Sequence, residues 1–398
     1  MGGTSSILKC TTPLQACEGH TGGVNCLAVS TDGNLLASGS DDCTIRLWKL
    51  IQGDQTTKGL RCDQILAGHT NYVTVLVFHQ CYLISGSADR TLKKWNLQSG
   101  QCYVTFKLHE DIVNTITCAN NYVFSGSNDR TATCWNLETG DLVHQFTGHT
   151  HPVTAIAYFG TNKMDNCGSQ DADSVATVLS SRFGPRECVY TGSADRTAKA
   201  WSVRSGKCTL TFKGHNGALT QIKLDRDGKL LYTASLDGTV RSWHTETAKP
   251  QYVFEGHKSA VVTMDLHDKM LCTGSTDGTA KTWLLSTAVL VRTYPGAKRT
   301  VNVVRMKDND YVVAVSEDGH VRWFDERTGI LCAIYGDKTF QCCNAFEMIG
   351  EFLVTTANDG VLYVWERKSV DLKENRLPDA SAGDSTEKHQ SHIQLAEM

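Results

Sequence analysis

The sequence predicts an all-β fold in which eight copies of one unit close into a ring of four-stranded sheets. The first observation is a repeat, because the pattern Ser-x-Asp-x-Thr-x-x-x-Trp returns about every 40 residues along a chain of 398 residues. The second is that each copy contains short β-branched and aromatic runs separated by Asp-Gly or Asp-Arg turns, which indicates strands joined by tight turns. Such a sheet is apolar on both faces and buries them only by stacking on neighbours, and a closed ring leaves no bare end.

The aromatic residue that ends each unit identifies the eight copies. These residues are Trp48, Trp95, Trp135, Trp201, Trp243, Trp283, Phe324 and Trp365. Six copies also have a His upstream of the Asp, and the fourth contains an insertion at residues 160–187 that is rich in Gly, Ser, Asp and Asn. A ring of seven units is the alternative, but it would leave one full unit with open faces.

The two ends of the repeat region predict how the ring closes. Residues 14–17 form a short strand-like run before the first Gly-His pair, whereas the chain turns polar after Trp365. We therefore expect residues 14–17 to pair with residues 361–366 and to complete the eighth unit, because the pairing satisfies an otherwise open edge. The ring is expected over residues 13–367, with a flexible segment at residues 1–12 and a disordered tail at residues 368–398.

With these marks the chain resembles the WD40-repeat β-propeller family over roughly residues 13–367. The resemblance implies a single eight-bladed propeller. It also implies a structural relay in each unit, in which the Trp indole N–H bonds a Ser, the Ser bonds a His, and the His bonds an Asp. The relay residues expected in blades one to six are His20, Ser40, Asp42 and Trp48; His69, Ser87, Asp89 and Trp95; His109, Ser127, Asp129 and Trp135; His149, Ser193, Asp195 and Trp201; His215, Ser235, Asp237 and Trp243; and His257, Ser275, Asp277 and Trp283.

The last two units depart from this pattern. In the seventh, Gly296-Ala297 stands at the Gly-His position and Phe324 at the Trp position, although Trp323 directly precedes it. In the eighth, Asp337 replaces the His and Ala357 the Ser. Phe324 has no N–H to donate, and the relay His is absent from the same unit. Because both groups are lost together, no buried polar group is left without a partner. We expect these two blades to rely on packing without a polar relay.

Composition and charge narrow the classes of function. A formal charge of −3 and a pI near 6.5 argue against the strongly basic face of a nucleic-acid-binding protein. No apolar run is long enough to span a bilayer, and the N-terminus lacks the apolar core of a signal peptide. Sixteen Cys are spread along the chain without a C-x-x-C pair, which is typical of buried small hydrophobes in a reducing compartment. We expect an intracellular, cytoplasmic protein.

Enzymatic activity is not expected. A set of His, Ser and Asp that recurs in six units around a ring is expected of a structural element. An enzyme, by contrast, requires one asymmetric active site. The chain also lacks a phosphate-binding loop, a His-Glu-x-x-His pair and a dinucleotide fingerprint. We therefore predict no catalytic residue, no metal and no cofactor, and a monomer whose partners are other proteins or peptides.

Partner binding is expected on the face that carries the loops before each first strand and the turns between second and third strands. Apolar, aromatic or basic residues at these positions are candidates for partner contacts, because such side chains anchor interfaces. They are Tyr72, Ile112, Leu236, Lys298, Arg299, Lys338 and Phe340. The basic members could recognise an acidic or phosphorylated peptide, and a solvated charge group is the alternative interpretation.

The start of the chain, Met-Gly-Gly-Thr-Ser-Ser, matches the signal for N-myristoylation, with Gly2 as the acceptor. Cys10 could accept a second acyl chain, which matters because a single myristoyl chain binds membranes only marginally. An ordinary flexible tail is the alternative.

Three functions are compatible with these features. The first is a non-enzymatic scaffold for protein interactions. The second is a substrate receptor of a cullin-RING ubiquitin ligase, for which residues 201–204 (Trp-Ser-Val-Arg) and 324–327 (Phe-Asp-Glu-Arg) are imperfect matches to the Trp-Asp-x-Arg motif that the resemblance implies. The third is a membrane-tethered signalling adaptor that depends on Gly2.

Overall fold

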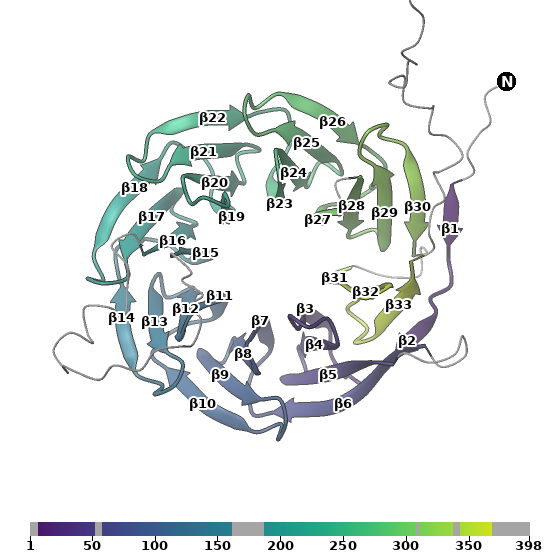
Figure 1. The fold of residues 1–398 in the computed structure, drawn as a ribbon, viewed down its shortest axis with the longest axis horizontal. Coiled ribbons are helices and arrows are strands. Elements are labelled where there is room, and N and C mark those ends of the chain that lie inside the picture. Colours follow the sequence, from purple (N-terminus) through teal and green to yellow (C-terminus); the bar gives the residue numbers. More distant parts are fainter. Residues whose placement is uncertain (1–6, 52–57, 161–186, 308–309, 337–342, 368–398) are drawn as a thin grey trace, which may run out of the picture. The chain divides into compact units, whose positions relative to one another are not determined.

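The computed structural model describes residues 7–51, 58–160, 187–307, 310–336 and 343–367. All elements in these ranges are β-strands, and they form eight sheets arranged around a central channel (Figure 1). The prediction of an eight-bladed ring is confirmed. Within each blade we call the strands a to d from the channel outward.

The first four blades each take their strands from the centre outward in chain order. Blade one consists of β3 (Val24–Val29), β4 (Leu35–Ser40), β5 (Thr44–Ile51) and β6 (Gly59–Ala67). Blade two consists of β7 (Val73–His79), β8 (Tyr82–Ser87), β9 (Thr91–Asn96) and β10 (Cys102–Lys107). Blade three consists of β11 (Val113–Ala119), β12 (Tyr122–Ser127), β13 (Ala132–Asn136) and β14 (Leu142–Phe146). Blade four consists of β15 (Val153–Phe159), β16 (Cys188–Ser193), β17 (Thr197–Ser202) and β18 (Cys208–Lys213).

The next three blades follow the same order. Blade five consists of β19 (Leu219–Leu224), β20 (Leu230–Ser235), β21 (Val240–His244) and β22 (Pro250–Phe254). Blade six consists of β23 (Val261–His267), β24 (Met270–Ser275), β25 (Ala280–Leu284) and β26 (Leu290–Tyr294). Blade seven consists of β27 (Val301–Lys307), β28 (Tyr311–Ser316), β29 (His320–Asp325) and β30 (Leu331–Tyr335).

The eighth blade is built from both ends of the ring. It combines β31 (Phe346–Ile349), β32 (Phe352–Thr356) and β33 (Leu362–Glu366) with the N-terminal strand β2 (Gln15–Cys17). Strand β2 runs antiparallel to β33, with Gln15 opposite Val364 and Cys17 opposite Leu362. The predicted closure of the ring by its N-terminal strand is therefore confirmed.

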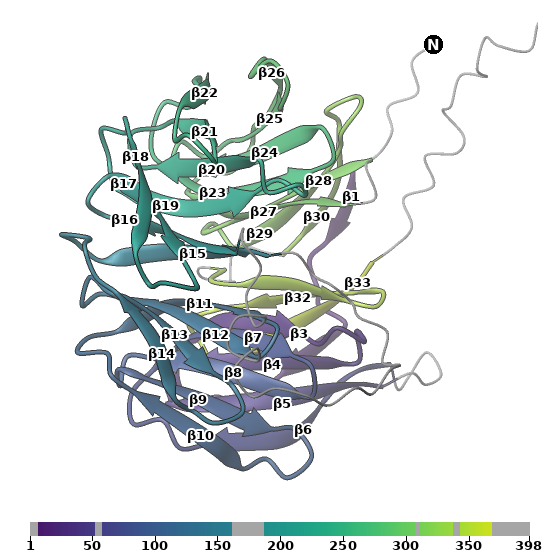
Figure 2. The ribbon, with the colours of Figure 1, turned by 60° about the vertical axis from the view of Figure 1, so that its left-hand side comes forward.

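The expectation of a flexible segment at residues 1–12 is wrong for residues 8–10. These form strand β1 (Leu8–Cys10), which pairs in parallel with β30 and gives blade seven a fifth strand (Figures 1 and 2). The physical reason is that the chain enters the ring beside the outer edge of blade seven, whose open backbone groups accept an added strand. Gly2, residues 161–186 of the predicted insertion, Asp337, Lys338, Phe340 and the tail 368–398 lie outside the described residues.

The cores lie between neighbouring blades, because each sheet buries both faces. Trp48, for example, packs with Val354 and Leu362 across the boundary between blades eight and one. Phe324 occupies the same position in blade seven and packs on Tyr294 of blade six, with ring centroids 5.1 Å apart. Among the described residues, seven of the eight blade boundaries, from that between blades eight and one to that between blades six and seven, each contribute an apolar cluster, as expected for a repeat architecture.

Candidate functional site

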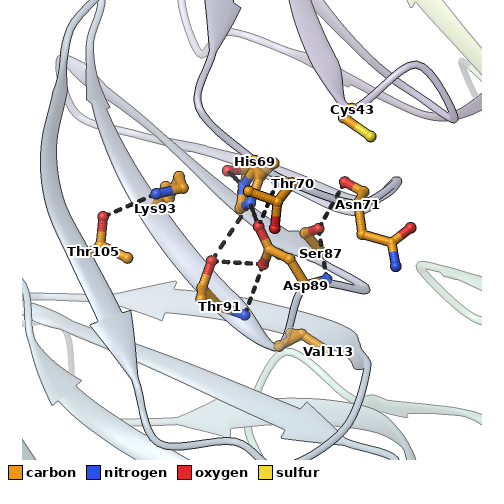
Figure 3. Close-up of polar contacts among 12 residues, drawn as sticks. Cys43, His69, Thr70, Asn71, Ser87, Asp89, Thr91, Lys93, Thr105 and Val113 are labelled. Atoms are coloured by element: carbon orange, nitrogen blue, oxygen red, sulfur yellow. Dashed lines mark hydrogen bonds and ion pairs between the residues drawn. The ribbon is translucent and has the colours of Figure 1, made fainter.

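Six blades contain a buried His–Asp pair beneath the loops of one face. In blades one to six the His Nδ1 lies 2.7–2.9 Å from a carboxylate oxygen of the predicted Asp. In blade two, Asp89 also accepts hydrogen bonds from Thr91 Oγ1 at 2.6 Å and from the backbone N–H of Thr70 at 3.1 Å (Figure 3). The carboxylate therefore ties the third strand of its blade to the loop that joins neighbouring blades.

The serine assigned to the relay is wrong by two residues. Trp48 donates its indole N–H to Ser38 Oγ at 2.8 Å, and His20 Nε2 lies 2.8 Å from the same oxygen. The hydroxyls that contact the His are Ser38, Ser85, Ser125, Thr191, Thr233 and Thr273 rather than Ser40, Ser87, Ser127, Ser193, Ser235 and Ser275. In blade three, Trp135 donates instead to Thr133 Oγ1 at 2.7 Å, and that oxygen lies 2.5 Å from Ser125 Oγ.

Strand register explains this correction. Trp48 lies directly opposite Leu36, so Ser38 is the next residue on the same face of the neighbouring strand and Ser40 the one after it. At about 3.3 Å of rise per residue, these side chains are displaced from Leu36 by roughly 7 and 13 Å, and the indole reaches only the nearer hydroxyl. Ser40 instead accepts from the backbone N–H of Asp42 and donates to the carbonyl of Gly22, which holds the turn between the b and c strands.

The protonation states make the relay of blade one directional. Burial raises the pKa of Asp42, but hydrogen bonds from Thr44 and His20 outweigh it and hold the pKa at about 2. Burial lowers the pKa of His20 despite its bond to Asp42. At neutral pH the imidazole is therefore neutral, donates through Nδ1 to the carboxylate, and accepts through Nε2 from the Ser38 hydroxyl.

The hydroxyl that contacts the His is fully buried in each of blades one to six. A hydroxyl, an imidazole and a carboxylate in series could activate a nucleophile if a substrate could reach the hydroxyl. Ser38 is fully buried, and its oxygen already accepts the N–H of Trp48. The relay accordingly supplies a partner for a buried indole and braces the face above it.

The expectation that blade seven lacks a polar relay is wrong. The Arg322 side chain lies beside Gly296, the residue before Ala297, which stands at the position of the relay His. Its guanidinium donates to Asp318 at 2.7 and 3.0 Å and to Ser316 at 2.8 Å. Burial would raise the pKa of Asp318, but bonds from His320 and Arg322 lower it well below its usual range. A buried ion pair thus replaces the relay.

Blades seven and eight each keep part of the expected pattern. Trp323, which precedes the core Phe324, is buried on the opposite side of the sheet, where Arg367 lies 5.3 Å from its ring centroid. In blade eight the indole N–H of Trp365 donates to Thr355 Oγ1 at 3.0 Å. Blade eight therefore retains the link between the indole and a hydroxyl.

A second repeated contact was missed in the sequence, although its signal is present there. In blades one to five the second residue of the a strand is Asn or Thr, and its side chain donates to the carbonyl of the first a-strand residue of the next blade. In blade seven Asn302 donates to the carbonyl of Cys343, and in blade eight Asn344, just before β31, donates to the carbonyl of Val24. The seven donors are Asn25, Thr74, Asn114, Thr154, Thr220, Asn302 and Asn344, at 2.5–3.3 Å. Val262 occupies this position in blade six and has no donor, so the ring of side-chain bonds is open between blades six and seven.

The predicted partner-binding residues lie on one face but in separate blades. Tyr72 and Ile112 are half-buried in the loops that lead into blades two and three, and Leu236 is 51% exposed in the b–c turn of blade five. Lys298 and Arg299 are exposed in the loop that leads into blade seven. The structure thus gathers the described candidates on the face braced by the relays, without bringing them into a single cluster.

The opposite face contains a cavity of about 680 Å³ between the inner strands of blades two to five. Its cations are already engaged, because Lys223 lies 2.6 Å from Asp265 and Arg226 lies 2.9 Å from Asp268. No group of three His, Cys, Asp or Glu side chains among the described residues is arranged to hold a metal ion. In the same residues, no helix has the length and apolar character needed to cross a membrane. We therefore place the candidate functional site on the relay face.

A family model supports the repeat assignment. The model described as "WD domain, G-beta repeat" matches residues 11–49, 60–96, 100–136, 140–202, 206–244 and 248–283, which is more than half of the chain. The chain therefore belongs to the WD40-repeat family. The matched segments end before blades seven and eight, the two blades whose relay residues are replaced.

Individual relatives share part of this chain. Human WD repeat-containing protein 86 is 34% identical over 228 residues, which cover 57% of this chain and 54% of the human protein. Mitochondrial division protein 1 of Saccharomyces cerevisiae is 26% identical over 214 residues, covering 51% of this chain and 24% of the yeast protein. The crystal structure of the computationally designed protein Ika8 aligns with a TM-score of 0.73 and 26% identity, covering 89% of this chain and 99% of Ika8. The chain thus spans about a quarter to a half of these natural relatives.

Proposed function

We propose that this WD40 propeller is a non-enzymatic scaffold that binds protein partners on the face braced by the relays. The observation that carries the proposal is the use of the polar residues. His, Asp and hydroxyl groups that could serve catalysis are buried and committed to one another in blade after blade, while apolar and basic side chains are left exposed above them. Leu236, 51% exposed at the tip of a rigid turn, is the clearest of these.

The test is partner capture by the full chain in cells, using proximity labelling with two matched variants. Leu236→Glu places a charge on the relay face, whereas Val289→Glu changes an apolar residue of similar exposure, 58%, in the c–d turn on the opposite face. We expect Leu236→Glu to lose labelled partners that wild type and Val289→Glu both retain. Equal loss in both variants, or in neither, would contradict binding on the relay face.

The ubiquitin-ligase receptor remains the second proposal, and partner identity separates it from a general scaffold. Its motif is weakened by Arg327, which pairs with Asp310 at 3.6 Å and follows Phe324 rather than a Trp. Recovery of a cullin adaptor among the labelled partners would favour the receptor function.

We also propose an intracellular monomer that becomes membrane-associated when Gly2 is acylated. Strand β1 supports this geometry, because it anchors the chain to blade seven six residues after Gly2 and places half-buried Cys10 in the same strand. Mass spectrometry of the N-terminal peptide from eukaryotic cells tests it, together with fractionation of wild type and Gly2→Ala. Absence of a myristoyl group on that peptide would rule out the tether.

A further inference from the structure

One position of the c–d turn changes from polar to apolar along the ring. In blades two to seven it is the residue whose carbonyl accepts the N–H of the last c-strand residue, at 2.9–3.0 Å. Blades six and seven carry Val289 and Ile330 there, with 58% and 53% of their surface exposed. In blades two to five the same position is polar, namely Gln101, Asp141, Lys207 and Lys249. Two neighbouring blades therefore expose an apolar side chain where four others expose a polar one.

The outer strand of blade six extends this apolar surface and connects it to blade seven. Leu290 and Val291 begin β26 and are 40% and 44% exposed. The next residue, Arg292, donates to the three carbonyls of residues 326–328 in the c–d turn of blade seven, at 2.5–3.1 Å. The exposed residues of β26 and the turn that carries Ile330 are thus held together as one surface.

Strand β1 brings the N-terminal part of the chain to the same place. It runs parallel to β30 with Leu8 opposite Ala333, so Ile7 lies beside the start of β30, and the chain enters β1 from the face that carries the c–d turns. Strands β26, β30 and β1 follow one another along the outer edge of the ring (Figure 1). Ile7 is 43% exposed. We call the apolar patch the set of Ile7, Val289, Leu290, Val291 and Ile330.

Two exposed lysines flank the apolar patch. Lys9 belongs to β1, and Lys269 lies beside the c–d turn of blade six, to which its carbonyl is hydrogen-bonded at 2.9 Å. Neither ammonium group is paired with a carboxylate of the described residues. The nearby carboxylates of Asp268 and Asp310 are each paired with an arginine, at 2.9 and 3.6 Å. The positive charges beside the patch are therefore the uncommitted ones.

A lipid bilayer is the partner that fits this surface. Its apolar side chains project from turn tips and an outer strand and are flanked by lysines, which is the pattern of surfaces that lie in the membrane interface. The lysine stems can cover apolar surface while their ammonium groups reach the lipid headgroups. The N-myristoylation signal is an independent argument, because Gly2 lies six residues before Leu8 and the chain enters β1 from this face.

An N-myristoylated chain requires such a surface. A single myristoyl chain gives only marginal, reversible membrane binding, so stable attachment takes a second contact. Cys10, the expected second acyl acceptor, is half-buried at the end of β1 away from Ile7, and its carbonyl accepts the N–H of Gly336 at 3.1 Å. The apolar patch lies at the other end of β1, toward Gly2 along the chain.

We propose that the apolar patch of blades six and seven inserts into the interfacial region of a lipid bilayer and supplies the second membrane contact of the N-acylated chain. This deepens the proposed membrane association through Gly2 and rests on it. Because the c–d turns and the relays lie on opposite faces of the ring, a propeller attached in this way keeps its relay face open to protein partners.

The experiment measures vesicle binding of the full chain, produced in bacteria with and without a co-expressed N-myristoyltransferase. The vesicles contain equal amounts of phosphatidylcholine and phosphatidylserine, and co-sedimentation gives the apparent affinity. The decisive variant is Val289→Gln/Ile330→Gln, because blade two already has Gln101 at this position and the fold accepts it. We expect the acylated variant to bind about tenfold more weakly than acylated wild type, with an unchanged melting temperature.

Ile65→Gln/Leu142→Gln is the matched control. It removes apolar residues of similar exposure, 53% and 42%, from the outer strands of blades one and three, and it should bind vesicles like wild type. Equal loss in both double variants, or wild-type affinity in Val289→Gln/Ile330→Gln, would overturn the proposal.

The unmodified chain separates this inference from the acylation on which it rests. Mass spectrometry that finds no myristoyl group after co-expression would rule out the tether, and the proposal with it. If the chain is acylated and binds vesicles, but the affinity does not depend on Val289 and Ile330, the tether stands and the apolar patch fails. Weaker binding of the unmodified double variant than of unmodified wild type, at higher lipid concentration, would support the patch independently of the acyl chain.

Discussion

Replacing Val262 with threonine should stabilise the propeller, because it supplies the one donor missing from the ring of side-chain bonds around the channel. At the equivalent positions of blades four and five, Thr154 Oγ1 donates to Leu219 O and Thr220 Oγ1 donates to Val261 O, each at 2.8 Å. Valine and threonine have nearly the same shape and both favour strands, so the change adds a donor without changing volume or backbone preference.

The size of the effect follows from the net value of one hydrogen bond. A typical intramolecular bond contributes about 0.5–1.5 kcal/mol after the loss of bonds to water, and Val262 is only half-buried, so the hydroxyl loses little hydration. We expect the free energy of unfolding to rise by about 1 kcal/mol, which corresponds to a rise in Tm of roughly 1–3 °C for a domain of this size.

Equilibrium denaturation in urea and calorimetry measure this change directly. Thr220→Val is the matched control, since it removes the same bond at the neighbouring blade boundary and should lower stability by at least as much. Destabilisation by Val262→Thr would refute the reasoning, because it would mean that the hydroxyl is buried without a partner. An unchanged stability in Thr220→Val would show that these bonds contribute nothing to the ring.

Three further predictions concern the relays and their substitute in blade seven. Ser38→Ala should lower the free energy of unfolding by about 2–4 kcal/mol, because it leaves both the Trp48 indole and His20 without their buried partner. The loss should exceed that of Ser40→Ala. If chemical denaturation ranks the two variants in the opposite order, Ser40 and not Ser38 is the relay residue. Arg322→Met should lower the free energy of unfolding by about 3–5 kcal/mol, because it leaves the buried Asp318 carboxylate without its partner. Adding Asp318→Asn to the same chain should restore part of this loss. Additive effects of the two changes on stability would argue against the ion pair. Acidification should destabilise the protein in two stages when Tm is followed against pH. His20 and His257 have lowered folded pKa values, so their contribution is present above about pH 6.5 and is lost below it, whereas Asp42 and Asp277, with a folded pKa of about 2, lose their contribution as the pH falls from about 4 toward 2. A Tm that stays constant from pH 7 to pH 3 would contradict these assignments.

Several errors at the level of single residues trace to information that the chain does contain. A hydroxyl residue stands ten positions before the Trp in seven blades, and in blade seven, where Phe324 replaces the Trp, the same position is Ala314. That covariation identifies Ser38 and its equivalents without a structure. The Asn and Thr residues of the channel ring likewise recur at the second position of the a strand in blades one to five and blade seven. Both signals follow from strand register, because side chains two residues apart along a strand lie on the same face.

Arg322 could not be assigned in the same way. It follows the repeat pattern of Arg46 and Arg241, and that pattern does not show that its guanidinium reaches Asp318. In blade one, Arg46 donates to the carbonyl of Gly19 and not to Asp42, because the Asp42 carboxylate is already hydrogen-bonded to His20. Where Ala297 leaves that space empty, the Arg322 guanidinium reaches Asp318 directly. The role of this arginine therefore depends on which side chain stands at the relay His position beside the Asp. That residue lies in the loop before the a strand, far from the arginine along the chain.

The sequence by itself determined the repeat, the number of blades and the closure by residues 14–17, because these follow from periodic spacing and from the need to bury two apolar faces. The pairing of each His with its Asp was implied by the resemblance to the WD40-repeat family. Only the tertiary structure decided the hydroxyl that each indole reaches, the ion pair that replaces the relay in blade seven, and the addition of strand β1 to its outer edge. Each of these depends on a distance between strands or blades that are far apart along the chain, and a periodic pattern specifies which residues repeat but not how closely they approach.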